Sequence, residues 1–193
     1  MKHLGRKLYH VGGGLGLLGV WFALGRPHAF LAYAGLLGAV LLFDCARFAL
    51  PRFNAWAMAH LSGLLRPGEE RTLNGSPAYI AGVALTLLLF PQPAAVVAVL
   101  FLIVGDVSAT AVGERWGRRR VGAKSLEGTA AFFVVAAAAG LAARVALGGP
   151  PAGAVVAGAW SAALVELFLP KFANDNLVIP PVAALAMTLL SAV

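Results

Sequence analysis

Apolar residues gather into long runs along the chain, and short charged or proline-containing segments separate the runs. Each run is a candidate membrane-spanning helix. A straight span needs about 20 residues, and several runs are shorter, so some of them could be re-entrant. The pattern predicts an all-α polytopic membrane protein with about seven transmembrane helices, at 9–24, 29–44, 77–92, 94–113, 128–147, 151–169 and 177–193.

Prolines and glycines mark the tightest predicted turns, at 91–93 and 148–151. Residues 1–34 also allow a second interpretation, a secretory signal peptide with a basic start and an "AYA" cleavage site. Three glycines at 12–14 interrupt that apolar run and many spans follow it, which favours a membrane span. We therefore expect one integral-membrane domain over residues 1–193.

Composition agrees with a membrane protein, because 60% of the 193 residues are hydrophobic and only 12% are charged. A single cysteine, Cys45, leaves no internal disulfide and no cysteine metal cluster. With the N-terminus in the cytoplasm, thirteen lysines and arginines lie on the cytoplasmic side, and only Arg26 and Arg144 lie opposite. This positive-inside bias sets the orientation and argues against a nucleic-acid partner for the net charge of +7. The Ala/Gly/Arg-rich usage suggests a prokaryotic plasma membrane.

The acidic residues are one-sided as well, although orientation rules count mainly lysine and arginine. Charges needed only for solubility would occur at both membrane surfaces. We therefore expect one cytoplasmic site where acids and bases from distant segments converge. The acids are Asp44, Glu69, Glu70, Asp106, Glu114, Glu127, Glu166 and Asp175.

Residues 100–133 carry the strongest signal for chemistry. Asp106 interrupts an apolar run, where an ionisable group is costly unless it is paired, hydrated or metal-bound. Gly113 and Gly117 follow it at helical spacing. This small-residue row is typical of close helix packing. It could equally be a bare surface for a phosphate chain, with Asp106 holding Mg²⁺ at its edge.

The stretch "GRRRVGAKS" (117–125) resembles a phosphate-binding P-loop, but Ala123 breaks the spacing and no soluble α/β sheet precedes it. Lys124 offers a cation and Ser125 a hydroxyl for phosphate oxygens. Glu127 could be a metal ligand, a base, or an acid favoured by the helix dipole, and Gly128 permits close approach. The arginines at 118–120 could contact nucleotide or anchor the chain to lipid headgroups.

Three further segments add polar candidates. Glu166 lies near the inner end of an apolar run, and Asp175 could bind a metal or simply cap the last helix. The loop at 64–79 could shield a site or merely connect spans, and residues 5–10 could be only a basic anchor. The other polar candidates are Arg6, Lys7, His10, Arg66, Glu69, Asn74 and Asn176.

This set suits phosphoryl transfer, which needs carboxylates for Mg²⁺ (or Mn²⁺), cations for phosphate charge and a group that orients or deprotonates an alcohol. The sequence has no HExxH or CxxC and no Ser/His/Asp order that would favour zinc chemistry or hydrolysis. The depth of Asp106 and Glu166 suggests an acceptor that enters laterally from the lipid.

Four ordered blocks resemble the polyprenol kinases, a family with dolichol, phytol and CTP-dependent diacylglycerol kinases. They are "RKLYH", "LRPGEERTLNGSPAY", "GDVSATAVGERWGRRRVGAKSLEGT" and "ELFLPKFANDNLVIPP". The resemblance implies transfer of the CTP γ-phosphoryl group to a lipid alcohol. It implies CTP binding by the third block through Gly105, Asp106, Gly113, Gly117, Lys124, Ser125, Glu127 and Gly128.

Combining the residues with the resemblance gives specific roles. The expected catalytic residues are Asp106, Lys124, Glu127, Glu166 and Asp175. The expected metal ligands are Asp106, Glu127 and Asp175, and Lys7 and Arg66 join the nucleotide site. The chain is shorter than eukaryotic dolichol kinases, which leaves the acceptor and the oligomeric state open.

Two alternatives stay open at this point. A cytidylyltransferase would also use CTP, but the Gly-His-Gly-Gly cluster and the Asp-Arg ending of phosphatidate cytidylyltransferases are absent from the sequence. A small ion- or proton-coupled transporter would use intramembrane acids. Charges at one face, away from the midplane, count against the transporter.

Overall fold

The computed structural model describes residues 4–61, 65, 68–170 and 173–192. The chain divides into two compact units, Met1–Ala81 and Gly82–Val193, and each is described by itself. The expectation of a single catalytic domain over residues 1–193 stays a prediction.

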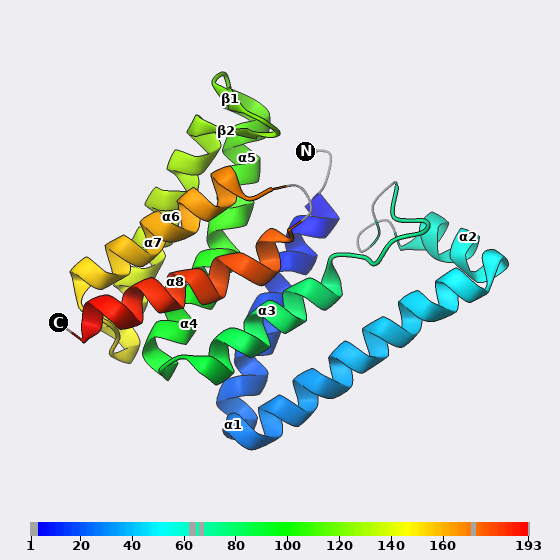
Figure 1. Cartoon of the computed structure of the whole chain (residues 1–193), viewed down its shortest axis with the longest axis horizontal. Coiled ribbons are helices and arrows are strands. Elements are labelled where there is room, and N and C mark those ends of the chain that lie inside the picture. The colour runs from blue at the N-terminus through cyan, green and yellow to red at the C-terminus, as the bar shows by residue number, and fades with distance from the viewer. Residues whose placement is uncertain (1–3, 62–64, 66–67, 171–172, 193) are drawn as a thin grey trace. The chain divides into compact units, whose positions relative to one another are not determined.

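The first unit contains a long bent helix, α1 (Leu4–Ala49), whose course reverses at Gly25. Gly25 has φ 71° and ψ 169°, a conformation that glycine adopts without the steric penalty of a Cβ atom. The Tyr33 hydroxyl donates a hydrogen bond to the Leu17 carbonyl (2.6 Å) and so joins the two arms. The predicted spans 9–24 and 29–44 are these two arms (Figure 1). Helix α2 (Pro51–His60) follows, and α3 (Ser76–Leu89) begins in this unit and continues into the second.

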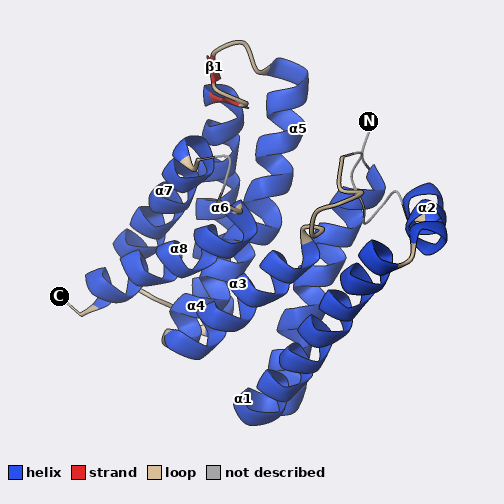
Figure 2. Cartoon of the chain, turned by 45° about the vertical axis from the view of Figure 1, so that its right-hand side comes forward, coloured by secondary structure: helices blue, strands red, loops and turns tan. Residues whose placement is uncertain are grey.

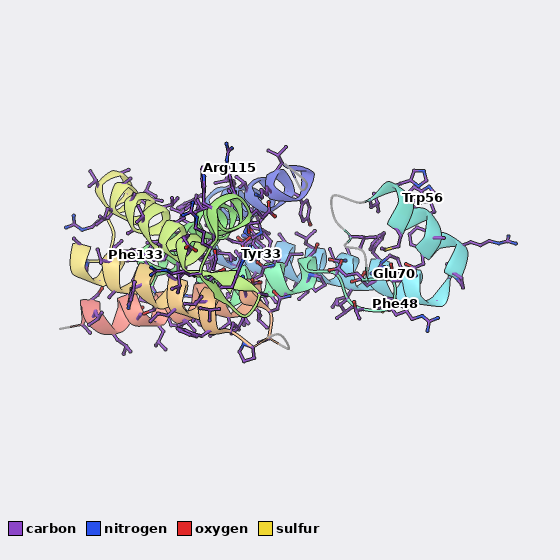
Figure 3. The ribbon with its side chains drawn as sticks, turned by 90° about the horizontal axis from the view of Figure 1, so that it is seen from above. Tyr33, Phe48, Trp56, Glu70, Arg115 and Phe133 are labelled. Carbon is purple, nitrogen blue, oxygen red and sulfur yellow. The ribbon has the colours of Figure 1, made fainter. Side chains whose placement is uncertain are left out.

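The second unit is a helical bundle (Figure 2). The segments α4 (Gln92–Leu100), the π-helical turn η1 (Phe101–Gly105) and α5 (Asp106–Trp116) run on from one another. Helix α6 (Leu126–Leu147) packs on α5 and on α7 (Ala152–Phe168), and α7 packs on α8 (Asp175–Ser191). Phe101, Phe132 and Met187 are fully buried in this core. Phe133, labelled in Figure 3, lies on α6. Its ring meets the Trp160 ring of α7 edge-on, with the centroids 5.3 Å apart.

A short β-hairpin joins α5 to α6, and the sequence did not predict it. Strand β1 (Arg120–Val121) pairs antiparallel with β2 (Lys124–Ser125), and Val121 lies opposite Lys124. Gly122 has φ 59°, the positive value that the first central residue of a type II′ turn requires. Ala123 completes the two-residue turn, which explains why the P-loop spacing fails here.

In the part of the chain that the structure describes, three helices are long and apolar enough to cross a membrane: Lys7–Ala49, Gln92–Trp116 and Leu126–Leu147. Ser76–Leu89, Ala152–Phe168 and Asp175–Ser191 are shorter apolar helices. Large apolar side chains such as Val145, Leu147 and Leu189 are more than 60% exposed, as bilayer contact would allow. The helical fold is confirmed, whereas seven spans and a cytoplasmic N-terminus stay predictions.

Candidate functional site

Lys124 is the centre of a polar cluster built from three separate segments of the second unit. The hairpin places Lys124 at the base of β2, Glu166 lies in the last turn of α7, and Asp175 begins α8. The Lys124 Nζ atom lies 2.9 Å from Glu166 Oε1 and 3.3 Å from Asp175 Oδ2. The structure therefore brings together three of the predicted catalytic residues.

Glu166 is held at both carboxylate oxygens. The Thr129 hydroxyl, one turn into α6, donates to Glu166 Oε2 (3.0 Å) and also approaches the Ser125 carbonyl (3.1 Å). Glu166 is only 4% exposed, and a buried carboxylate needs such partners. Thr129 was missed as a site residue, although its place at the end of "KSLEGT" was a signal.

The charge of Lys124 is set by two opposing effects. Burial disfavours the ammonium form, but attraction by Asp175, Glu166 and Asp106 outweighs burial and raises the pKa of Lys124 above its usual value. Lys124 is therefore a cation at neutral pH. Since Lys124 and Asp175 remain 35% and 32% exposed at their side chains, the cluster is open on that side.

Asp106 begins α5 directly after the π-helical turn η1. Single π-helical turns inside α-helices occur frequently at functional sites. The turn is packed tightly, since a Cβ atom on Gly105 would lie 2.6 Å from the Phe132 ring. The sequence predicted a continuous α-helix here and gave no signal for the π-helical turn.

The glycines of the third block surround Ser125. A Cβ atom added to Gly113 or to Gly128 would lie 3.0 Å from the Ser125 hydroxyl oxygen, and one added to Gly117 would lie 2.7 Å from it. That hydroxyl also accepts the Gly128 N–H (3.1 Å) and so caps α6. These glycine faces are therefore occupied by protein atoms, as the close-packing interpretation predicts. Nucleotide binding by Gly105, Gly113, Gly117, Ser125 and Gly128 stays a prediction.

Glu127 faces the hairpin backbone. Its carboxylate accepts the N–H groups of Arg118 (3.1 Å) and Arg119 (3.2 Å).

Asp175 is not the cap of α8, because Asn174 fills that position and accepts the Asn176 N–H. Within the described part of the chain, no group of three Asp, Glu, His or Cys side chains is placed to hold a metal ion. Metal binding by Asp106, Glu127 and Asp175 stays a prediction.

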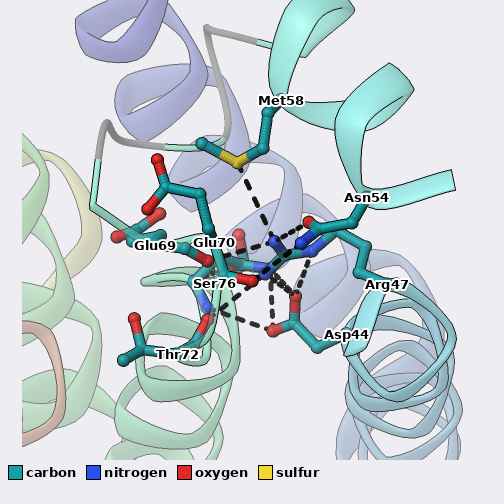
Figure 4. A network of polar contacts seen from close by, with 9 residues as sticks. Asp44, Arg47, Asn54, Met58, Glu69, Glu70, Thr72 and Ser76 are labelled. Atoms are coloured by element: carbon teal, nitrogen blue, oxygen red, sulfur yellow. Dashed lines mark hydrogen bonds and ion pairs between the residues drawn. The ribbon is translucent and has the colours of Figure 1, made fainter. Parts of the chain in front are cut away.

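A second polar cluster lies in the first unit (Figure 4). Arg47 pairs with Asp44 (2.6 Å), and both side chains are completely buried. Arg47 also donates to the Asn54 side chain and to the Glu69 and Thr72 carbonyls. The Asn74 side chain and backbone N–H donate to the Asp44 carboxylate. This pair fastens the loop before α3 to the end of α1. Asp44 and Arg47 are three residues apart, a spacing that indicates such a pair on a helix, although the pair was not predicted.

The remaining predicted residues also belong to the first unit, apart from Asn176. The Tyr79 hydroxyl donates to the His10 carbonyl, and their rings lie 4.6 Å apart. Asn74 also accepts the Ser76 N–H at the start of α3. Lys7 lies in the first arm of α1. Arg66 and the side chain of Arg6 lie outside the described residues. A shared site for Lys7, His10, Glu69 and Lys124 stays a prediction.

Comparison with known proteins gives two informative matches. The chain is 35% identical over 94 residues to CTP-dependent diacylglycerol kinase 1 of Schizosaccharomyces pombe, covering 47% of the chain and 43% of that protein. It is 34% identical over 99 residues to the protein of the same name from Eremothecium gossypii, covering 50% and 31%. The chain thus matches less than half the length of either relative.

No protein-family profile matches the chain. No solved structure matches it either. Over about half of its length the chain is similar to CTP-dependent diacylglycerol kinases, and the predicted resemblance to the polyprenol and lipid kinases is confirmed.

Proposed function

We propose that the chain is a membrane-embedded lipid kinase that transfers the γ-phosphoryl group of CTP to a lipid alcohol. The observation that supports this best is the Lys124 cluster, in which carboxylates from two helices hold a cation that is about one third exposed. The names of the two relatives support both CTP and a lipid acceptor. Three long and three shorter apolar helices among the described residues support a site within reach of lipid. The site faces the cytoplasm in this proposal.

Lys124 is the residue that meets the nucleotide. Its ammonium is accessible, and a compact cation at this position can exchange its carboxylate partners for phosphate oxygens. Phosphoryl transfer depends mainly on positioning and charge stabilisation. Glu166, which also binds Thr129, holds the Lys124 ammonium in place.

The reaction exchanges one phosphorus–oxygen bond for another and moves one proton. The acceptor hydroxyl oxygen bonds to the γ-phosphorus while the bond from that phosphorus to the β–γ bridging oxygen breaks, and CDP leaves. The hydroxyl proton passes to a carboxylate of the cluster. Asp175 is more exposed than Glu166 and is the better candidate, and in that role it would leave Mg²⁺ to Asp106.

Asp106 and Asp175 are the residues that would hold Mg²⁺. Mg²⁺ is usually bound by one or two carboxylates together with substrate phosphates, and both aspartates act on Lys124. The bound ion would neutralise charge on the β- and γ-phosphates. Glu127 is the weaker candidate, because its carboxylate accepts two backbone N–H groups.

Diacylglycerol is the first acceptor to test, since it is named in both relatives. Polyprenols, dolichol and phytol follow from the broader family resemblance. Purified protein in detergent with Mg²⁺ receives CTP labelled at the α- or the γ-phosphate, together with each alcohol. We expect γ-label in the lipid and release of CDP.

The same assay, run in parallel with a lipid phosphate as the acceptor, separates the alternatives. Transfer of α-label into lipid phosphate with release of pyrophosphate would indicate a cytidylyltransferase instead. No transfer to any acceptor would contradict both enzymatic functions and leave the transporter, which uptake by vesicles would test. ATP and GTP serve as donor controls.

A further inference from the structure

The end of α5 and the hairpin that follows it carry a dense basic surface that the proposed kinase chemistry does not use. We call it the basic rim: Arg115, Trp116, Arg118, Arg119 and Arg120. All five residues are exposed, and Trp116 is 57% exposed. The Arg115 guanidinium lies over the Trp116 ring, 5.0 Å from its centroid. Glu114 and the Glu127 carboxylate add two acids beside these four arginines, so the rim keeps a net positive charge.

The backbone beneath the rim is fixed. The Glu127 carboxylate accepts the Arg118 and Arg119 N–H groups, and the Leu126 N–H donates to the Arg119 carbonyl (3.0 Å). The β1–β2 pairing and the Gly122 turn close the segment. Arg118 and Arg119 are thus held by their main chain while their side chains lie in the open. A pre-ordered loop loses less conformational entropy when it binds a ligand.

The position of the rim in the chain sets its surroundings. It connects Gln92–Trp116 to Leu126–Leu147, two helices that are long and apolar enough to cross a membrane. A nine-residue connection between two spans lies at a membrane surface. Exposed tryptophan is enriched at that depth, and clustered arginines beside a span attract anionic lipid.

We infer that the basic rim binds the phosphate headgroups of anionic phospholipids at this membrane surface. Guanidinium groups bind phosphate oxygens through paired hydrogen bonds, and the Trp116 indole sits at the headgroup boundary. Lys124, in contrast, is turned toward Glu166 and Asp175. This inference does not depend on the kinase proposal, because headgroup binding needs no transfer chemistry.

The test uses the full chain in nanodiscs of phosphatidylcholine that contain 30% brominated lipid. The brominated lipid is either phosphatidylglycerol or phosphatidylcholine. Quenching by bromine measures how often a lipid contacts tryptophan, and comparison with Trp116→Phe isolates the contribution of Trp116. We expect excess quenching by the brominated phosphatidylglycerol. It should fall about tenfold or more in Arg118→Gln/Arg119→Gln, given about fivefold per arginine near an anionic surface.

The matched control is Arg26→Gln/Arg144→Gln, which removes the same charge from the predicted opposite face and should leave the excess unchanged. In the unmodified chain the excess should disappear in 1 M salt, where the Debye length is about 3 Å. Equal quenching by both lipids, or an equal loss in the control, would overturn the inference. Loss of the excess quenching when CTP is added without Mg²⁺, at unchanged ionic strength, would overturn it too, because it would show that the rim binds nucleotide.

Discussion

The two units each bury an acid–base pair, and the pairs differ in what remains open to a ligand. Asp44 and Arg47 are completely buried, and side chains and carbonyls of the surrounding loop take up their hydrogen bonds. Lys124 and Asp175 keep about a third of their side chains exposed. Pairs of opposite charge therefore have two different roles in this chain. The closed pair fastens a loop, and the open cluster can exchange its partners for a substrate.

The largest expected effect is on transfer by Lys124→Met. It should lower kcat/KM about 10³-fold, since loss of one group that stabilises developing charge costs 10²–10³-fold. The γ-label assay measures this, and thermal unfolding in detergent verifies that the variant is folded. Arg144→Met, at the other end of α6, is the control and should retain activity. A folded Lys124→Met protein with full activity would mean that the site is elsewhere.

Arg47→Met should lower the free energy of unfolding. It leaves the Asp44 carboxylate buried without its cation, which costs about 3 kcal/mol of unfolding free energy or more. The double variant Asp44→Leu/Arg47→Met should recover part of that loss, because no unpaired charge remains. Activity per folded molecule should stay within about threefold of the parent. Loss of transfer without loss of stability would move this pair into the active site.

Thr129→Val tests the support of Glu166 and should have an intermediate effect. Removal of the hydroxyl leaves one oxygen of a buried carboxylate without a partner, so kcat should fall about tenfold. KM for CTP should change less than kcat. Thr129→Ser keeps the donor and should restore most of the activity. Equal loss in the valine and serine variants would indicate a packing role instead.

The smallest effect concerns pH. The pKa of Lys124 is raised in the folded state, so its ion pairs contribute fully below the unfolded pKa near 10.5 and are lost as pH rises through the higher folded pKa. The difference in melting temperature between the parent and Lys124→Met should therefore stay constant from about pH 7 to 9.5. Lys124→Arg should behave like the parent. A difference that shrinks between about pH 7 and 8.5 would mean that Lys124 loses its proton there.

Sequence identified the open cluster because ionisable residues stand out in an apolar chain. Lys124, Glu166 and Asp175 were all predicted, and the structure joins them. The Asp44–Arg47 pair was missed because Arg47 was counted only as an orientation charge. The hairpin was missed because two-residue strands have no periodicity, although Gly122 beside Ala123 was a turn signal. The π-helical turn before Asp106 depends on packing against α6, which no local pattern encodes.

The glycine row shows a different limit of sequence reasoning. Spacing predicted Gly113 and Gly117 on one helix face. The helix ends at Trp116 and Gly117 is its extended cap, yet both glycines face the same group, which spacing could not identify. In the structure that group is the Ser125 side chain. Small residues predict close approach of some group, and only the tertiary fold identifies the group.

The central claim is that the open cluster binds nucleotide phosphate through Lys124 while the closed pair does not. Equilibrium binding of labelled CTP with Mg²⁺ to the purified full chain tests it most directly. Lys124→Met should weaken the Kd about 10- to 100-fold, the value of one or two charge-assisted hydrogen bonds, and Arg47→Met should leave the Kd of the folded protein within about threefold. Unchanged binding in Lys124→Met, or an equal loss in both variants, would contradict the account.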